Sequence, residues 1–128
     1  MRVLLKLSGE ALAGDKKTGF DEETVLAVAQ QVKKIVDMGT QVGIVIGGGN
    51  FWRGRSSENI DRTKADQIGM LATVMNCLAV SDVMEQKDIP ARVQTATEMR
   101  AFAETYTRQR AVKHLEEGKV GLFAGGTG

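Results

Sequence analysis

Glycine-bearing turns follow two apolar, strand-like runs near the start of the chain. The first run is LLKLSGE, residues 4–10, and the second is VGIVIGGGNFWRG, residues 42–54. Glycine has no Cβ, so a strand that ends in glycines presents bare backbone N–H groups to anions at the carboxyl edge of a sheet. A third turn, GLFAGGTG at residues 121–128, repeats the pattern. The turns predict a binding site for a phosphorylated ligand.

Two basic side chains stand beside these turns. Lys6 ends the first apolar run, directly before Leu7, Ser8 and Gly9, and Arg53 follows the GGG run of residues 47–49. Phosphoryl transfer needs fixed positive charge and backbone donors around the migrating group, and a guanidinium suits phosphate oxygens. A structural role fits the same residues, since a lysine can extend from a strand edge and a GGG run is typical of a tight loop.

The elements that must position these residues alternate between strand and helix. Apolar runs predict strands at residues 2–7, 41–46, 91–95 and 120–124. Asp21 is the expected N-cap of a helix over residues 22–38, and a second helix is expected over about 64–86, before Pro90. Residues 101–106 and 107–117 are predicted as a broken or paired helix. This order predicts a parallel sheet built from strand–helix–strand units.

Composition limits the class of protein. The chain has 128 residues, 42% of them hydrophobic, which suffices for one globular domain. A net charge of +1 gives no overall field that would favour nucleic acid or an anionic membrane. The lone cysteine, Cys77, excludes an internal disulfide, and no signal peptide or membrane-spanning run is recognised, so we expect a cytoplasmic protein.

Four blocks in order carry a family resemblance. KLSGEAL, VGIVIGGGNFWRG, DQIGMLATVMN and FAGGTG together resemble the bacterial uridylate (UMP) kinase branch of the amino-acid kinase family, and the match runs from Arg2 to Gly128. The DQIGMLATVMN block separates this branch from its relatives. The resemblance implies an α/β fold, a three-layer αβα sandwich with a mostly parallel sheet. It also implies transfer of the γ-phosphoryl group of ATP to UMP, giving UDP in pyrimidine nucleotide biosynthesis.

The resemblance also assigns residues to the two nucleotides. It implies catalytic roles for Lys6 and Arg53, and an ATP side made of Lys6, Leu7, Ser8, Gly9, Gly49 and Arg53. The UMP side consists of Gly48, Asp66 and Thr127. Asp66 is expected to accept hydrogen bonds from ribose hydroxyls, although a carboxylate that opens a helix is also favoured by the helix dipole. No metal ligand is implied, and Mg²⁺ would accompany ATP.

A lysine-bearing turn, GDKKTG, precedes the first predicted helix. In the family the corresponding segment is linked to activation by GTP, which here implies an allosteric role for Gly14, Asp15, Lys16, Lys17, Thr18 and Gly19. A solvated loop fits these residues equally. The resemblance further implies inhibition by UTP and a homohexamer, with no nucleic-acid or membrane partner.

Residues 1–128 correspond to the N-terminal, acceptor-nucleotide part of the family's domain, without its C-terminal ATP-binding part. We therefore expect the 128-residue chain alone to be inactive. Two alternatives stay open, namely another family member that phosphorylates a carboxylate or carbamate, and a non-catalytic nucleotide-binding fragment. The block around Asp66 argues against the first alternative. His114, which has no partner at ligand spacing in the sequence, and Cys77 are assigned structural roles.

Overall fold

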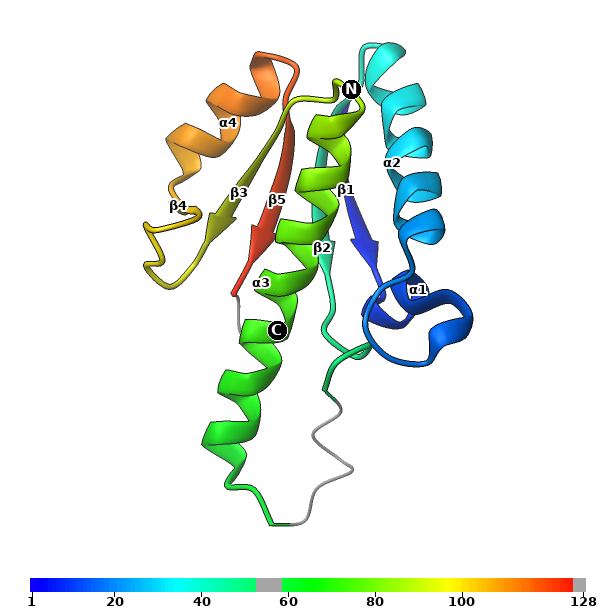
Figure 1. Ribbon diagram of the computed structural model, residues 1–128. Coiled ribbons are helices and arrows are strands. Elements are labelled where there is room, and N and C mark those ends of the chain that lie inside the picture. The colour runs from blue at the N-terminus through cyan, green and yellow to red at the C-terminus, as the bar shows by residue number, and fades with distance from the viewer. Residues whose placement is uncertain (53–58, 126–128) are drawn as a thin grey trace.

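Parallel pairing joins every strand of the sheet in the computed structural model, which describes residues 1–52 and 59–125 (Figure 1). Within these residues the sheet has five strands in the order β1-β2-β5-β3-β4. Their bounds are β1 Arg2–Leu7, β2 Gln41–Ile46, β3 Ala91–Thr95, β4 Glu104–Thr105 and β5 Val120–Ala124. The four longer strands lie where the sequence predicts them.

The described helices are α1 Gly9–Ala13, the short 3₁₀ helix η1 Gly14–Lys16, α2 Glu22–Asp37, α3 Arg62–Gln86 and α4 Arg108–Glu116. Both α2 and α3 confirm predicted helices, whereas α1 and η1 are not predicted. Asp21 is the N-cap of α2, as expected, because its Oδ2 accepts hydrogen bonds from the Thr24 backbone N at 3.1 Å and the Thr24 Oγ1 at 2.7 Å.

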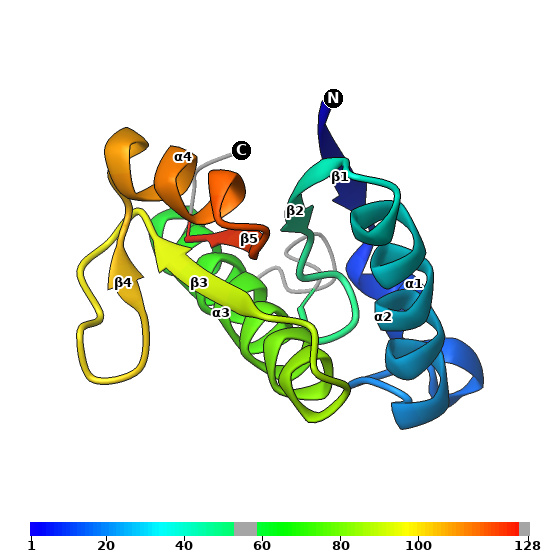
Figure 2. The same cartoon turned by 90° about the horizontal axis from the view of Figure 1, so that it is seen from above.

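The strand order explains which face each helix covers. The connections through α2 and α3 run in one direction across the sheet, but the connection through α4 returns from β4 past β3 to β5, which lies between β2 and β3. Because parallel crossovers are right-handed, this reversal moves α4 to the opposite face from α2 and α3. Figure 2 shows α3 and α4 on opposite sides of β3 and β5, so the architecture has the three layers expected of an α/β sandwich.

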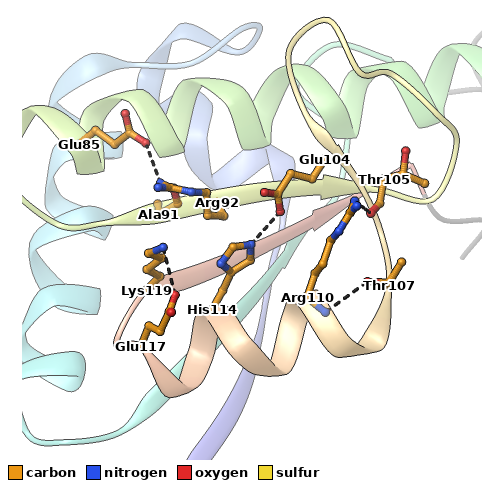
Figure 3. Close-up of polar contacts among 10 residues, drawn as sticks. All are labelled: Glu85, Ala91, Arg92, Glu104, Thr105, Thr107, Arg110, His114, Glu117 and Lys119. Atoms are coloured by element: carbon orange, nitrogen blue, oxygen red, sulfur yellow. Dashed lines mark hydrogen bonds and ion pairs between the residues drawn. The ribbon is translucent and has the colours of Figure 1, made fainter.

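The predicted helix over residues 101–106 is wrong. That segment forms turns and the short strand β4, which pairs with β3 through Gln94↔Glu104 and Thr95↔Thr105. The Tyr106 backbone N donates to the Thr95 carbonyl O at 2.8 Å, so hydrogen bonds to a distant strand hold the backbone extended. Helix α4 begins only afterwards, where the Thr107 hydroxyl caps it by accepting from the Arg110 backbone N at 3.2 Å (Figure 3).

His114 of α4 has a partner that the sequence did not reveal. Its Nε2 lies 2.7 Å from Oε1 of Glu104 on β4, and Arg110 Nη1 donates to the Thr105 carbonyl O at 3.3 Å (Figure 3). These contacts fasten α4 to the outer strand of the sheet. This contact between α4 and β4 agrees with the structural role that we assign to His114.

The hydrophobic core lies between the sheet and the layer of α2 and α3. Its fully buried side chains include Leu12, Val25, Ile44, Ile46, Val80, Met84 and Leu122. Cys77 of α3 belongs to this core, and burial raises the pKa of its thiol to about 12. The thiol therefore stays protonated and inert at neutral pH, which agrees with its assigned structural role.

Helix α3 is the one described helix that is long and apolar enough to cross a membrane by length and composition. Its buried residues Val74, Val80 and Met84 pack into the core instead, as in the central helix of a globular domain. Ile68, Leu71 and Met75 on the same helix are at least 37% exposed, so part of its apolar surface lies outside the core.

The face of the sheet that carries α4 is only partly covered. The strand register places Lys6, Val45, Phe123, Gln94 and Glu104 in one row across this face. At the β1 end, Leu4 is 57% exposed and Val45 is 37% exposed. The apolar surface of β1 and β2 on this side therefore meets solvent.

Candidate functional site

Two of the predicted glycine turns interlock at the carboxyl edge of the sheet. β1 and β2 pair in register up to Leu7↔Ile46, so the turns that follow them begin side by side. A Cβ placed on Gly9 would collide with the Gly47 carbonyl oxygen and lie only 2.9 Å from the Gly49 backbone N. Only glycine fits at position 9, because the two backbones approach within the space of a methyl group.

The second turn also packs tightly against α3. A Cβ on Gly48 would lie 2.7 Å from the Ala72 Cβ and 3.1 Å from the Gly69 carbonyl O. The sequence led us to expect that the backbone N–H groups of this turn are free to bind an anion. The N–H of Gly47 is not free, because it donates to the Leu7 carbonyl O at 2.9 Å and continues the hydrogen bonding between β1 and β2. The turn is thus fixed on one side by β1 and on the other by α3.

Lys6 and Ser8 flank the first turn in different ways. Lys6 is exposed and lies on the partly covered face of the sheet, where its ammonium group can reach solvent or a ligand. Ser8 is the N-cap of α1, since its Oγ accepts from the Ala11 backbone N at 3.1 Å. The unpredicted helix α1 therefore starts directly after the first turn, and Leu7 and Gly9 on either side are half-buried and buried.

Asp66 lies on α3 but does not open it, which corrects the expectation. The helix begins at Arg62 after Asp61, so Asp66 is in its second turn and is exposed. Residues three apart share a helix face, and Gly69 is the residue whose carbonyl lies against Gly48. Asp66 thus stands about one turn before the contact between α3 and the glycine loop. Figure 1 shows that the first turns of α3 extend past the ends of the strands.

The third glycine turn reaches the same stretch of α3. Gly125 has a φ of 77°, in the region that favours glycine, and its backbone N donates to the Thr73 Oγ1 at 3.1 Å. Thr73 is the neighbour of Ala72, which contacts Gly48. The structure therefore brings the described parts of all three turns together. Arg53 and Thr127, the other predicted site residues, lie outside the described residues.

A cavity of about 590 Å³ opens between these turns on the α4 face. Gly47, Ala96 and Gly125, at the ends of β2, β3 and β5, line it together with Leu4, Val45, Phe123 and Tyr106. The cavity lies at the carboxyl edge of the parallel strands, which is where open α/β sheets bind ligands. Among residues 1–52 and 59–125, no three His, Cys, Asp or Glu side chains gather as a metal site.

The predicted regulatory segment is attached to the glycine loop. Lys16 and Lys17 are exposed, and Lys17 has a φ of 68°. The Gly19 backbone N donates to the Asn50 carbonyl O at 2.9 Å, and the Thr18 Oγ1 donates to the same oxygen at 3.0 Å. The end of the segment 14–19 is therefore hydrogen-bonded to Asn50, the residue that follows the GGG run.

Sequence reasoning missed two residues of this region, Asn50 and Asn76. Both are buried, and their side-chain amides are hydrogen-bonded to each other between the glycine loop and α3. One sequence signal was available, because Asn76 is an amide on the apolar helix face that also carries Ala72 and Val80. A polar residue in that position needs partners, and the neighbouring loop supplies them.

Solved structures of known proteins resemble this chain over nearly its whole length. The UMP kinase of Bacillus anthracis is 44% identical, with a TM-score of 0.92 over 98% of this chain and 52% of that one. The UMP kinase of Ureaplasma parvum is 30% identical, with a TM-score of 0.92 over 99% of this chain and 56% of that one. The chain thus spans about half the length of these relatives.

A more distant match shows the fold alone. The aspartate kinase of Synechocystis is 20% identical, with a TM-score of 0.71 over 97% of this chain and 22% of that one. A sequence profile of the amino acid kinase family matches residues 1–128. The chain therefore belongs to the amino acid kinase family.

Proposed function

We propose that the chain forms the acceptor-nucleotide part of a UMP kinase, which transfers the γ-phosphoryl group of ATP to UMP and so produces UDP. The observation that carries the proposal is the convergence of three glycine turns on one edge of the sheet, in a chain that is 44% identical to the UMP kinase of Bacillus anthracis. Backbone approaches of this kind suit phosphates, which both substrates carry.

The proposed roles divide the site between the two nucleotides. Lys6, Leu7, Ser8 and Gly9 would line the ATP phosphates with Gly49 and Arg53, whereas Gly48, Asp66 and Thr127 would hold UMP. Gly48 and Gly49 are neighbours in one loop, so the γ-phosphate of ATP and the phosphate of UMP would meet there. Lys6 would place its positive charge beside the negative charge that develops on the transferring phosphoryl group. It would therefore stabilise the transition state more than the bound substrates, and so lower the activation barrier.

Mg²⁺ is proposed to arrive with ATP. The described residues hold no cluster of three metal-ligating side chains, and Mg²⁺ in kinases is held largely by substrate phosphates and water with one or two carboxylates. The ion would neutralise charge on the phosphates. GTP activation through Gly14–Gly19, UTP inhibition, a homohexamer and a cytoplasmic location complete the proposal.

A chimaera tests the substrate. This chain replaces the matching half of the Bacillus anthracis UMP kinase, and ATP consumption is measured with UMP, CMP, aspartate and carbamate as acceptors. We expect turnover with UMP and little with the other three. A chimaera that folds, as judged by circular dichroism, but prefers aspartate or carbamate would refute the proposal in favour of another family activity.

Asp66→Asn in the same chimaera examines the acceptor side. Loss of the carboxylate should raise the KM for UMP about tenfold, the effect of one charge-assisted hydrogen bond, and change the KM for ATP about twofold at most. Asp61→Asn is the matched control, because Asp61 is an exposed aspartate that precedes the same helix. An equal loss for both nucleotides in Asp66→Asn would contradict an acceptor-side role.

A further inference from the structure

Two buried asparagines form a closed pair beneath the glycine loop. Asn50 is 2% exposed and Asn76 is 0% exposed. The Nδ2 of each donates to the Oδ1 of the other, and both bonds measure 2.8 Å. Asn50 ends the loop, and Asn76 lies on α3, so the pair joins segments that are distant in the sequence.

Each asparagine uses its remaining N–H group to hold a backbone carbonyl. Asn76 Nδ2 donates to the Gly47 O at 2.8 Å, and Asn50 Nδ2 donates to the Gly19 O at 2.8 Å. Every amide N–H of the pair therefore has a partner, and each Oδ1 accepts one bond. A fully satisfied buried network fixes one arrangement, because any shift leaves a desolvated amide unpaired.

The position of the pair connects it to the proposed phosphate side. A Cβ on Gly9 would lie 2.5 Å from the Asn50 Oδ1, and Ala72, one turn before Asn76, is the residue against which Gly48 packs. The Asn50 backbone O also accepts from the Gly19 N at 2.9 Å. Three segments, namely the first turn, the glycine loop and residues 14–19, thus meet at Asn50.

We propose that Asn50 and Asn76 are positioning residues, which set the glycine loop for its ligand and couple it to residues 14–19. Asn76 holds the loop against α3 through its hydrogen bond to the Gly47 carbonyl. Asn50 is bonded both to the Gly19 carbonyl and to Asn76, so it links residues 14–19 to the same loop. A displacement of residues 14–19 would therefore distort the hydrogen bonds between Asn50 and Asn76, which orient the loop. The identity of the loop's ligand rests on the proposed function, whereas the coupling is a property of the free chain.

Amide hydrogen exchange in the 128-residue chain tests the coupling. Asn76→Ala leaves the acceptor of the Gly19 amide, the Asn50 backbone O, in place. Any local weakening of that hydrogen bond must therefore result from a shift of Asn50. We expect exchange of the Gly19 amide to accelerate about tenfold beyond the change in global stability, the equivalent of about one hydrogen bond. The matched control is Val80→Ala, which truncates a side chain of 0% exposure one turn further along α3.

Asn50→Ala provides a second variant should Asn76→Ala fail to fold. It should accelerate Gly19 exchange at least as much, and the double variant should add little, because either single change already breaks the pair. Equal acceleration in Val80→Ala and Asn76→Ala, or fully additive effects in the double variant, would overturn the coupling.

Nucleotide binding provides the readout that a purely structural role would not move. With ATP and UMP as separate probes in calorimetry, Asn76→Ala should weaken the affinity of the chimaera about tenfold relative to Val80→Ala. Faster Gly19 exchange with unchanged affinity would overturn the positioning role. An unmodified chimaera that binds neither nucleotide at millimolar concentration would refute the proposed function instead, and the exchange experiment on the 128-residue chain would still decide the coupling.

Discussion

Single residues at the carboxyl edge of the sheet show how closely the site depends on side-chain size. Gly9, Gly48 and Gly49 each stand where a Cβ would meet another atom within 3.0 Å. At these positions the absence of a side chain permits close contact between segments, and the φ of each lies outside the left-handed region. These glycines therefore allow the turns to pack closely against one another and against α3.

Lys6→Ala should slow the chemical step of the chimaera while leaving substrate binding nearly intact. Charge that acts on a phosphoryl transition state contributes about 10²–10³-fold to kcat, so we expect that loss with a KM for UMP within about threefold. Steady-state kinetics measure both constants. Arg2→Ala is the control, because Arg2 is also cationic, exposed and on the same face of β1. Wild-type kcat in Lys6→Ala would refute the catalytic role.

The residues that sequence reasoning could identify are those with local signatures. Lys6, Ser8 and Gly48 stand in recognisable blocks beside apolar runs, whereas Asn50 and Asn76 have meaning only as a pair across two segments. A pairing between a loop and a helix face depends on tertiary packing, which the spacing of residues along the chain does not encode. The buried partners of a site are therefore harder to predict than its glycines.

At the scale of elements, local signals predict the long elements well. β1, β2, β3 and β5 follow apolar runs, and α2 has both its N-cap and an apolar face. The segment 101–106 was predicted as helix because its composition favours one, but pairing of β4 with β3 overrides that preference. Helix α1 was missed because SGE reads as a turn, although Ser8 caps a helix there.

The N-cap of α2 should make stability depend on acidic pH. Hydrogen bonds from the Thr24 hydroxyl and backbone N–H lower the pKa of Asp21 below its ordinary value of 3.8. A lowered folded-state pKa stabilises the fold above pH 3.8, and this contribution is lost as pH falls through the folded-state value. Asp21→Ala should thus be less stable than wild type at pH 7, and the difference should shrink below pH 3.8.

Urea unfolding at several pH values measures this difference. Asp37→Ala is the control, because Asp37 is an exposed aspartate at the other end of α2, where a negative charge is unfavourable to the helix dipole. That variant should lack the stability loss at pH 7. A pH-independent difference between wild type and Asp21→Ala would show that the cap does not act through its charge.

The segment of residues 14–19 provides a test of regulation. Changing Lys16 and Lys17 together to Ala in the chimaera should abolish activation by GTP and preserve basal turnover, because both side chains are exposed and their charge would attract a triphosphate. Lys33 and Lys34, adjacent exposed lysines on α2, form the matched control pair. Activation that persists unchanged without Lys16 and Lys17 would reject the GTP role of the segment.

At the scale of the whole molecule, the sheet order and the exposed surface were the least predictable features. The order of strands and helices along the chain does not determine that β5 lies between β2 and β3 in the sheet. That insertion places α4 on its own face and leaves β1 and β2 partly bare there, with Leu4 at 57% exposure. Such apolar surface, together with the outer edge of β1, favours contact with other polypeptide.

We therefore expect the 128-residue chain to self-associate and to show no significant UMP kinase activity, since its open site does not exclude water from a transferring phosphoryl group. Sedimentation velocity at increasing concentration measures the association. Combining Leu4→Glu with Leu71→Glu should reduce it by placing charge on the bare sheet face and on α3. Met38→Glu, at a methionine of 80% exposure at the end of α2, should not. A monomeric chain with enzyme-like turnover would contradict both expectations.

The pairing of Gly43 with Gly121 at the middle of the sheet has a consequence for the order of events during synthesis. β2 cannot acquire its central neighbour until α3, β3 and α4 have been made, because β5 follows all of them. A nascent chain on the ribosome must therefore carry an incomplete sheet until the residues of β5 emerge. Long-range parallel pairs close slowly, so β2 stays available to wrong partners throughout that interval, and chaperone occupancy during translation should be greatest before β5 appears.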